Sequence, residues 1–332
     1  MKSLPQPPVE LFDLAIGYQK SKTLFACLEF GIPTLLAQGE LSLSDIAHQL
    51  RLHPIAADRL LNACTALGLL ERVGVEYCNT ELSDTFLVQG KPTYLGAQYL
   101  NYDRTSYENW SQLTQKLREW RPGETNAQPP QEEDQGSESL SAQHNLAVLV
   151  GHALAKAYDF SRHRLLLDLG GGTGAMSIGI CGVHHELTSI VYDLPQIGDA
   201  ARRFIEEAGL SARITVTTGD FKQDELPDGF DVVLLANFLS VSSEETNRQL
   251  LKKLYERLPG GGAVILSGWI LEDTRTAPLI PLLFCLEDIN WQAPDVERSF
   301  QTYEEWLAAA GFVNIKHEMY CPPTSMIVGR KG

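Results

Sequence analysis

The sequence predicts an α/β protein with a doubly wound, mostly parallel sheet and an antiparallel end strand, preceded by an all-helical domain of winged-helix type. A glycine-rich turn follows an apolar run at 164–175, RLLLDLGGGTGA, which is typical of a buried central strand that leads into a helix. From there to the end of the chain, strand-like and helix-like runs alternate. The first 90 residues instead predict helix, helix and hairpin. With 332 residues, 44% of them hydrophobic, the chain can fill two cores.

Composition and charge exclude several classes of protein. The formal net charge is -15 and the isoelectric point is near 5.0, whereas a nucleic acid or an anionic membrane needs a basic partner. The six cysteines are spaced singly, with no C-x-x-C pair, so we expect no disulfide framework, no metal site and a reducing, cytoplasmic setting. No apolar signal run opens the chain, and no apolar stretch reaches about 18 residues, so we expect a soluble protein.

The N-terminal domain is expected over residues 1–90. Residues 11–36 predict two helices broken near 31–33, and Ser44 is the expected N-cap of the next helix. A further helix should end near Gly68 and be followed by a short hairpin, which completes a winged helix-turn-helix pattern.

Two functions compete for this domain. DNA binding needs several cations on the recognition helix, but only Arg59 is available there, and residues 1–90 hold ten acidic against six basic residues. The apolar stripes of residues 11–36 are too extensive for the surface of a monomer. We therefore expect a dimerisation domain and a homodimer.

A helical connector is expected over residues 91–163, forming part of the substrate pocket. Its first section is rich in tyrosine and tryptophan, which at helical spacing are usually core residues. The segment 124–143 has five acidic residues and no basic one, so we expect a mobile loop, which could also act as a lid. On the apolar helix that follows, His144 and His152 lie on one broad face, either as core residues or as a base or substrate ligand.

The C-terminal domain, residues 164–332, alternates strands and helices. Strands are expected at 164–169, 188–194, 214–219, 231–236, 263–268, 316–320 and 325–329, and helices near 175–182, 196–208, 244–258, 278–290 and 302–310. In such sheets the ligand binds at the carboxyl ends of the parallel strands.

The glycine turn supplies the first part of a ligand site. Gly170, Gly172 and Gly174 leave backbone amides bare at a helix N-terminus, where a polar ligand can bind. The glycine spacing also matches a dinucleotide fingerprint, but Asp168 is an awkward neighbour for a pyrophosphate. Its carboxylate suits the cationic amino group of an amino-acid-bearing ligand instead.

Acidic residues at the next two strand ends extend this site. Asp193, nineteen residues after Gly174, is placed to accept hydrogen bonds from a ribose diol, and Asp220 with Phe221 is placed for an adenine amino group and ring face. Leu194, the last residue of the second strand, and Asn237, which follows the fourth, are assigned to the same site. Each acid alone is more often a helix cap, but the three together favour S-adenosylmethionine.

Six segments carry a resemblance to a known family: LLLDLGGGTG, YDLPQI, GDF, FDVVLLANFLS, LPGGGAVILSGWIL and YEEWLAAAGF. Over nearly its whole length the chain resembles the S-adenosylmethionine-dependent small-molecule O-methyltransferases, the group that includes caffeic acid O-methyltransferase and many bacterial natural-product enzymes. The resemblance implies a Rossmann-like methyltransferase domain, S-adenosylmethionine as cofactor, a dimerising N-terminal domain, and methyl transfer to a small aromatic or polyketide-like acceptor.

The usual catalytic residues of that family are incomplete in this chain. Ser240 stands where the family has its histidine base, and a family carboxylate is replaced by Gly268, whereas Glu297 is retained. A serine that is not activated cannot remove a proton at neutral pH. The acceptor could ionise unaided or be a carbon, or Glu297, His144, His152 or a tyrosine could act as the base. The chain could instead carry out rearrangement or hydroxylation chemistry, or have a binding or regulatory role without catalysis.

Overall fold

The computed structural model describes residues 8–121, 132–290 and 298–332. It divides into two compact units, one made of Met1–Ser111 with Pro130–Asn145 and the other of Gln112–Pro129 with Leu146–Gly332. Each unit is described by itself. The functional division expected at residues 90 and 163 stays a prediction.

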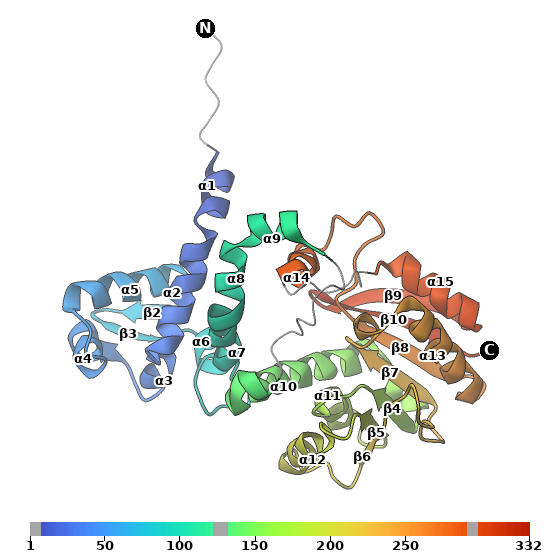
Figure 1. Cartoon of the computed structure of the whole chain (residues 1–332). Coiled ribbons are helices and arrows are strands. Elements are labelled where there is room, and N and C mark those ends of the chain that lie inside the picture. The colour runs from blue at the N-terminus through green and yellow to red at the C-terminus, as the bar shows by residue number, and fades with distance from the viewer. Residues whose placement is uncertain (1–7, 122–131, 291–297) are drawn as a thin grey trace. The chain divides into compact units, whose positions relative to one another are not determined.

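The first unit is helical with one small sheet (Figure 1). Its elements are α1 (Val9–Ala15), α2 (Gly17–Glu29), α3 (Ile32–Leu36), β1 (Leu41–Ser42), α4 (Leu43–Gln49), α5 (Pro54–Ala66), β2 (Leu70–Val73), β3 (Glu76–Asn79), α6 (Glu81–Phe86), α7 (Gly96–Asn101), a short π-helix (Tyr102–Ser106) and α8 (Tyr107–Ser111). The strands pair antiparallel in the order β1-β3-β2. Ile32, Leu61 and Tyr77 are buried in its core, so the predicted helix–helix–hairpin pattern is present.

Two local predictions in this unit are wrong. Residues 11–36 form parts of three helices, because the chain leaves helical geometry at Ile16 as well as at Gly31. The N-cap of α4 is Ser42, and Ser44 lies inside the first turn. The Ser42 hydroxyl oxygen accepts from the backbone N–H of Asp45 at 3.2 Å and donates to the Asp45 carboxylate at 2.6 Å, a reciprocal cap that Ser44 lacks.

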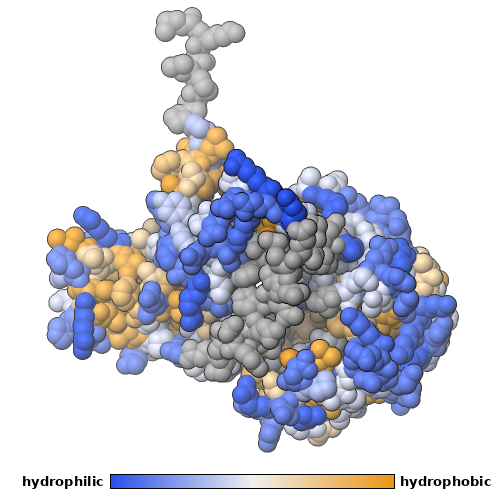
Figure 2. All heavy atoms as spheres, viewed as in Figure 1, coloured by the Kyte–Doolittle hydropathy of each residue, from blue (hydrophilic) through white to orange (hydrophobic). Residues whose placement is uncertain are grey.

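The first helix has an unpartnered apolar face. In α1, the side chains of Val9, Leu11, Phe12 and Leu14 are 63% to 76% exposed, and no residue of this helix is buried. Figure 2 shows the corresponding apolar atoms gathered over α1. Contiguous exposed apolar surface of this kind marks an interaction site.

The acidic segment is not the loop that we expected. Helix α10 (Glu132–Ala157) includes residues 132–143, and the rest of the predicted loop lies outside the described residues. Ser139 and Ala142, three residues apart, are buried within the first unit, and the Ser139 hydroxyl group lies 3.4 Å from the Gln98 side-chain oxygen. Packing of this small-residue face supports the helix in spite of its acidic composition.

The second unit holds a seven-stranded sheet in the order β6-β5-β4-β7-β8-β10-β9. The strands are β4 (Leu165–Leu169), β5 (Thr188–Asp193), β6 (Ile214–Thr218), β7 (Val232–Ala236), β8 (Ala263–Gly268), β9 (Val313–Cys321) and β10 (Thr324–Arg330). Besides the second half of α10, the helices are α9 (Leu113–Glu119), α11 (Ala175–Val183), α12 (Gly198–Glu207), α13 (Glu244–Arg257), α14 (Leu279–Asn290) and α15 (Phe300–Ala310). The first five strands in this order are parallel, and β10 runs antiparallel to both β8 and β9. The predicted fold class is confirmed.

The order of the strands determines where a ligand can bind. The chain proceeds outward from β4 through β5 to β6, and then returns to β7 and proceeds the other way to β8. Because such crossovers are right-handed, α11 and α12 cover one face of the sheet and α13 covers the other. The switch point lies between β4 and β7, and ligands bind beyond the carboxyl ends of strands at such a point.

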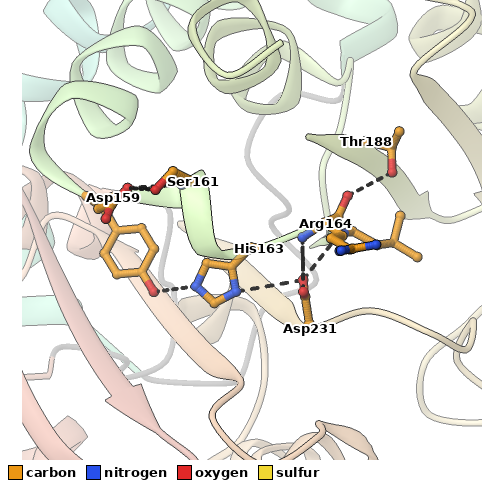
Figure 3. Close-up of polar contacts among 8 residues, drawn as sticks. Asp159, Ser161, His163, Arg164, Thr188 and Asp231 are labelled. Atoms are coloured by element: carbon orange, nitrogen blue, oxygen red, sulfur yellow. Dashed lines mark hydrogen bonds and ion pairs between the residues drawn. The ribbon is translucent and has the colours of Figure 1, made fainter. Parts of the chain in front are cut away.

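A polar network fixes the opposite, amino ends of the same two strands (Figure 3). The Asp231 carboxylate, just before β7, accepts from the backbone N–H groups of Arg164 at 2.9 Å and Leu165 at 3.2 Å. His163 lies between this carboxylate, at 3.7 Å, and the Tyr158 hydroxyl, at 2.8 Å, and burial lowers the pKa of His163. The network holds the start of β4 against β7 and leaves their carboxyl ends to the ligand site.

Candidate functional site

The glycine turn after β4 adopts a backbone that other residues rarely take. Gly170, Gly172 and Gly174 have φ of 72°, 54° and 76°, and Gly174 is the N-cap of α11. A Cβ atom on Gly170 would lie 2.1 Å from the ring of Phe238. The turn therefore needs glycine both for its backbone conformation and for the close approach of an aromatic ring.

Asp193, at the end of β5, is held by two backbone amides. Its Oδ2 atom accepts from the N–H of Gly172 at 2.8 Å, and its Oδ1 atom accepts from the N–H of Leu194 at 2.7 Å. Each oxygen retains a lone pair for a further donor. The carboxylate is thus oriented before any ligand binds, and it ties the glycine turn to the neighbouring strand.

A first cavity of about 430 Å³ lies over these strand ends, within the size range of small-molecule sites. It is lined by Leu169, Gly170, Tyr192, Asp193, Leu194, Gly219, Asp220, Phe221, Lys222, Ala236, Asn237, Phe238 and Ser242. Six residues predicted for the cofactor are among them: Gly170, Asp193, Leu194, Asp220, Phe221 and Asn237. The rings of Phe221 and Phe238 meet edge to face, with their centroids 5.1 Å apart, and form an apolar wall.

Asp220 caps its own turn and also lines the first cavity. Its carboxylate accepts from the backbone N–H of Lys222 at 3.0 Å and from the side-chain amide of Gln223 at 2.8 Å, as in a turn cap. These hydrogen bonds lower the pKa of Asp220 and keep the carboxylate ionised. The same residue lines the first cavity, so capping its turn does not remove it from the site.

Asp168 is not among the residues that line this cavity, and its contact with the cofactor stays a prediction. Its side chain is 0% exposed, and Oδ2 accepts a 2.6 Å hydrogen bond from the Ser177 hydroxyl. Oδ1 is buried without a hydrogen-bond partner in the described parts of the chain, and burial raises the pKa of Asp168 to about 6. A Cβ atom on Gly171 would lie 2.8 Å from the Asp168 carboxyl carbon, so this group supports the turn from the protein side. Gly172 and Gly174 also shape the turn without lining the cavity.

A second cavity of about 310 Å³ adjoins the first, and Asn237 and Phe238 line both. Its other lining residues are Leu235, Leu239, Ser240, Leu266, Ser267, Gly268, Trp269, Ile270, Leu271, Pro281, Phe284, Cys285, Asp288, Arg298 and Tyr303. The rings of Trp269 and Phe284 lie 4.2 Å apart between centroids, and burial raises the pKa of Tyr303 to about 12. Among these described lining residues there is no histidine, and Tyr303 stays protonated at neutral pH.

Of the predicted catalytic residues that the structure describes, Ser240 lines the second cavity and the two histidines line neither. The Ser240 hydroxyl donates to the backbone carbonyl of Asn237 at 3.3 Å, and no basic side chain of the described residues is hydrogen-bonded to it. His144 is buried in the first unit and His152 is exposed on α10, and neither lines either cavity. Glu297 lies outside the described residues, so its role stays a prediction.

Aromatic residues beside the strand ends were missed at the sequence level. Phe238 and Trp269 follow β7 and β8 at their carboxyl ends, in the positions where this fold binds ligands. Their signal was available, because Trp269 comes directly after a predicted strand and Phe238 comes two residues after another.

Fold and site together define a class of protein, the S-adenosylmethionine-dependent methyltransferases. The family model for the O-methyltransferase domain matches residues 124–313, and the model for the O-methyltransferase dimerisation domain matches residues 12–89. The chain belongs to the O-methyltransferase family and uses S-adenosylmethionine. Its N-terminal domain is the dimerisation domain of that family, as expected in place of DNA binding.

Individual relatives span nearly the whole chain. The chain is 33% identical over 322 residues to 3-hydroxy-5-methyl-1-naphthoate 3-O-methyltransferase of Streptomyces sahachiroi, covering 95% of this chain and 92% of the relative. It is 30% identical over 325 residues to the N,N-dimethyltransferase OxyT of Streptomyces rimosus, covering 94% of each. Human N-acetylserotonin methyltransferase, solved in complex with S-adenosylmethionine, superposes with a TM-score of 0.84 at 29% identity and covers 100% of this chain and 99% of that one.

Membrane spans and metal clusters are both missing from the described residues. No helix among them combines the length and the apolarity needed to cross a membrane. Nor do they contain a group of three or more histidine, cysteine or acidic residues arranged to hold a metal ion.

Proposed function

We propose that this natural-product O-methyltransferase methylates a small aromatic or polyketide-like acceptor without a histidine base. The single observation that carries the proposal is the lining of the second cavity. Its described residues supply aromatic and aliphatic surface, including Trp269 and Phe284, but no histidine, with Ser240 in the family's base position. The naphthoate methyltransferase of Streptomyces sahachiroi, a relative at 33% identity, supports a flat aromatic acceptor.

The first cavity has the donor and acceptor groups that S-adenosylmethionine needs. We assign the ribose diol to Asp193, whose carboxylate is already oriented, the adenine ring to the Phe221 and Phe238 wall, and the adenine amino group to Asp220. The bare backbone at Gly170 lets a polar ligand lie against the turn. When bound, this cofactor supplies an electrophilic methyl group on a positively charged sulfur, which leaves as a neutral thioether.

Without a histidine base, the acidity of the acceptor itself decides how readily it loses its proton. A phenol with a pKa near 10, like that of tyrosine, is ionised to only about one part in a thousand at pH 7. An acidic phenol or enol is ionised to a much larger extent and needs no side chain to remove its proton. We therefore assign the acceptor to acidic hydroxyl compounds.

Nitrogen is the second candidate for the acceptor atom. The relative OxyT is an N,N-dimethyltransferase at 30% identity. A neutral amine already has a free lone pair, so transfer to nitrogen needs no deprotonation beforehand. This agrees with the absence of histidine from the described lining of the second cavity.

One experiment tests both parts of the proposal. Calorimetry should give saturable binding of S-adenosylmethionine, and incubation with a panel of acidic phenols, enols and aromatic amines should give products one methyl group heavier. Fragmentation of each product identifies oxygen, nitrogen or carbon as the acceptor atom. Cofactor binding without turnover of any oxygen or nitrogen acceptor would contradict the proposed reaction, and a product methylated on carbon would replace it.

A further inference from the structure

We propose that the side-chain amide of Asn237 donates a hydrogen bond to the reacting oxygen of the acceptor and so favours its ionised form. This inference rests on the proposed function and assigns a binding group to the same site. Asn237 lines both cavities, at the boundary between them. It thus stands where the acceptor oxygen and the methyl donor have to meet.

The space at Gly268 places the amide on the acceptor side of this boundary. A Cβ atom on Gly268 would lie 2.8 Å from the Oδ1 atom of Asn237. Gly268 is among the residues that line the second cavity and is absent from the lining of the first. The Asn237 side chain therefore lies over the space that a side chain at position 268 would fill, with its amide oxygen nearest. A half-turn of the amide exchanges its oxygen and nitrogen, so the N–H group can take this place and face the acceptor rather than the cofactor.

The backbone of Asn237 is held in an unusual conformation. Its φ is 50°, in the left-handed region, which asparagine tolerates better than most residues. Its N–H donates to the carbonyl of Ser267 at 2.8 Å, and its own carbonyl accepts from the Ser240 hydroxyl at 3.3 Å. Such strain is maintained where surrounding contacts fix it, and it is common at functional sites.

The amide of Asn237 is available to a ligand. The residue is exposed, and in the described parts of the chain its side-chain nitrogen and oxygen make no hydrogen bond. A carboxamide offers two N–H donors and one acceptor and does not titrate near neutral pH. It can stabilise an oxyanion but cannot remove a proton, so the acceptor proton goes to water.

The expected effect is a lower pKa for the bound acceptor. A hydrogen bond to a charged group is stronger than one to its neutral form, and the difference corresponds to about one to two pKa units. 4-Nitrophenol is a direct probe, because its absorbance distinguishes the phenol from the phenolate. We would titrate it on the native protein with S-adenosylhomocysteine present, so that no methyl transfer occurs.

Two variants remove the N–H donors of the Asn237 side chain, and they differ in what else they change. Asn237→Gly deletes the amide and is compatible with a positive φ, and Asn237→Asp keeps the shape but replaces the donors with a negative charge. Both should raise the pKa of bound 4-nitrophenol by about one to two units. Binding of S-adenosylhomocysteine should change less than about threefold in Asn237→Gly, because the amide faces the acceptor.

Gly268→Ala tests the geometry by moving the amide instead of removing it. The added methyl group would meet only the end of the Asn237 side chain, which can rotate away. The pKa of bound 4-nitrophenol should rise in the Gly268→Ala protein, but Gly268→Ala should have no further effect in the Asn237→Gly background. Gly182→Ala is the matched control, because nothing lies within 4 Å of its added Cβ atom, and it should leave the titration unchanged.

Three results would overturn this inference. They are an unchanged pKa of bound 4-nitrophenol in both Asn237 variants, additive effects of Gly268→Ala and Asn237→Gly, or failure of the native protein to bind 4-nitrophenol at millimolar concentration. None of these results alters cofactor binding or turnover by the native protein. Failure of this inference is therefore distinguishable from failure of the proposed function.

Discussion

The buried carboxyl group of Asp168 should make the stability of the protein depend on pH in an unusual direction. Burial, opposed by the hydrogen bond from Ser177 and reinforced by the charge of Asp193, raises the pKa of Asp168 from 3.8 to about 6. The folded state therefore binds a proton more tightly than the unfolded state. The stabilisation is complete below the unfolded pKa and is lost as the pH rises through about 6.

The magnitude follows from the two pKa values. A shift of about 2.2 units corresponds to roughly 3 kcal/mol over the whole transition, of which about 1.4 kcal/mol falls between pH 5 and pH 7.5. Asp168→Asn cannot titrate, so its free energy of unfolding lacks this contribution. The native protein should therefore lose about 1.4 kcal/mol relative to Asp168→Asn between those two pH values, whatever constant cost the amide brings.

Urea unfolding of both proteins at half-unit pH steps measures this difference. Only the change with pH is compared and not the absolute stabilities, so other titrating groups cancel. Ser177→Ala provides a control, because loss of the hydrogen bond that lowers the pKa of Asp168 should move the transition to higher pH. Parallel stability curves for the native protein and Asp168→Asn would refute the reasoning, since they would mean that Asp168 has the same pKa folded and unfolded.

Three further predictions concern function and assembly. Asp193→Ala should weaken S-adenosylmethionine binding by about 1.5 to 3 kcal/mol for each charge-assisted hydrogen bond to the ribose, and an unchanged dissociation constant in calorimetry would contradict this assignment. We propose a homodimer through residues 11–36, so light scattering at micromolar concentration should give twice 36.8 kDa, and Leu11→Asp with Leu14→Asp on exposed α1 should shift the mass toward one chain. The methyl-transfer rate should rise with pH as the acceptor ionises, without a step near pH 6 to 7 from a titrating histidine, and Ser240→Ala should keep that profile. A step in that range would instead point to a histidine base.

The strands of the second unit could be predicted because buried strands have a continuous apolar sequence. The runs that form β7 and β8 are almost wholly apolar, and their predicted ends agree with the structure within one residue. Where such apolar runs alternate with helices along a chain, they usually form buried parallel strands. The turn at Gly170 was also predictable, because only glycine takes that conformation easily.

The features that the sequence did not predict depend on contacts with residues that are distant along the chain. The acidic stretch beginning at Glu132 has the composition of a loop, but burial of Ser139 and Ala142 within the first unit supports a helix. Asp168 belongs to a strand whose alternate residues face opposite sides, and the side on which a carboxylate lies depends on the neighbouring strands. The structure buries the side chain of Asp168, which the sequence did not predict, and its contact with the cofactor stays a prediction.

Backbone amides orient the cofactor half of the site, whereas the acceptor half depends on the space around a side chain. This difference determines which substitutions each half tolerates. On the cofactor side, Asp193 is oriented by the backbone amides of Gly172 and Leu194, which side-chain changes elsewhere leave in place. On the acceptor side, the amide of Asn237 depends on the empty space at Gly268. A substitution in the second cavity should therefore change the acceptor without changing cofactor affinity.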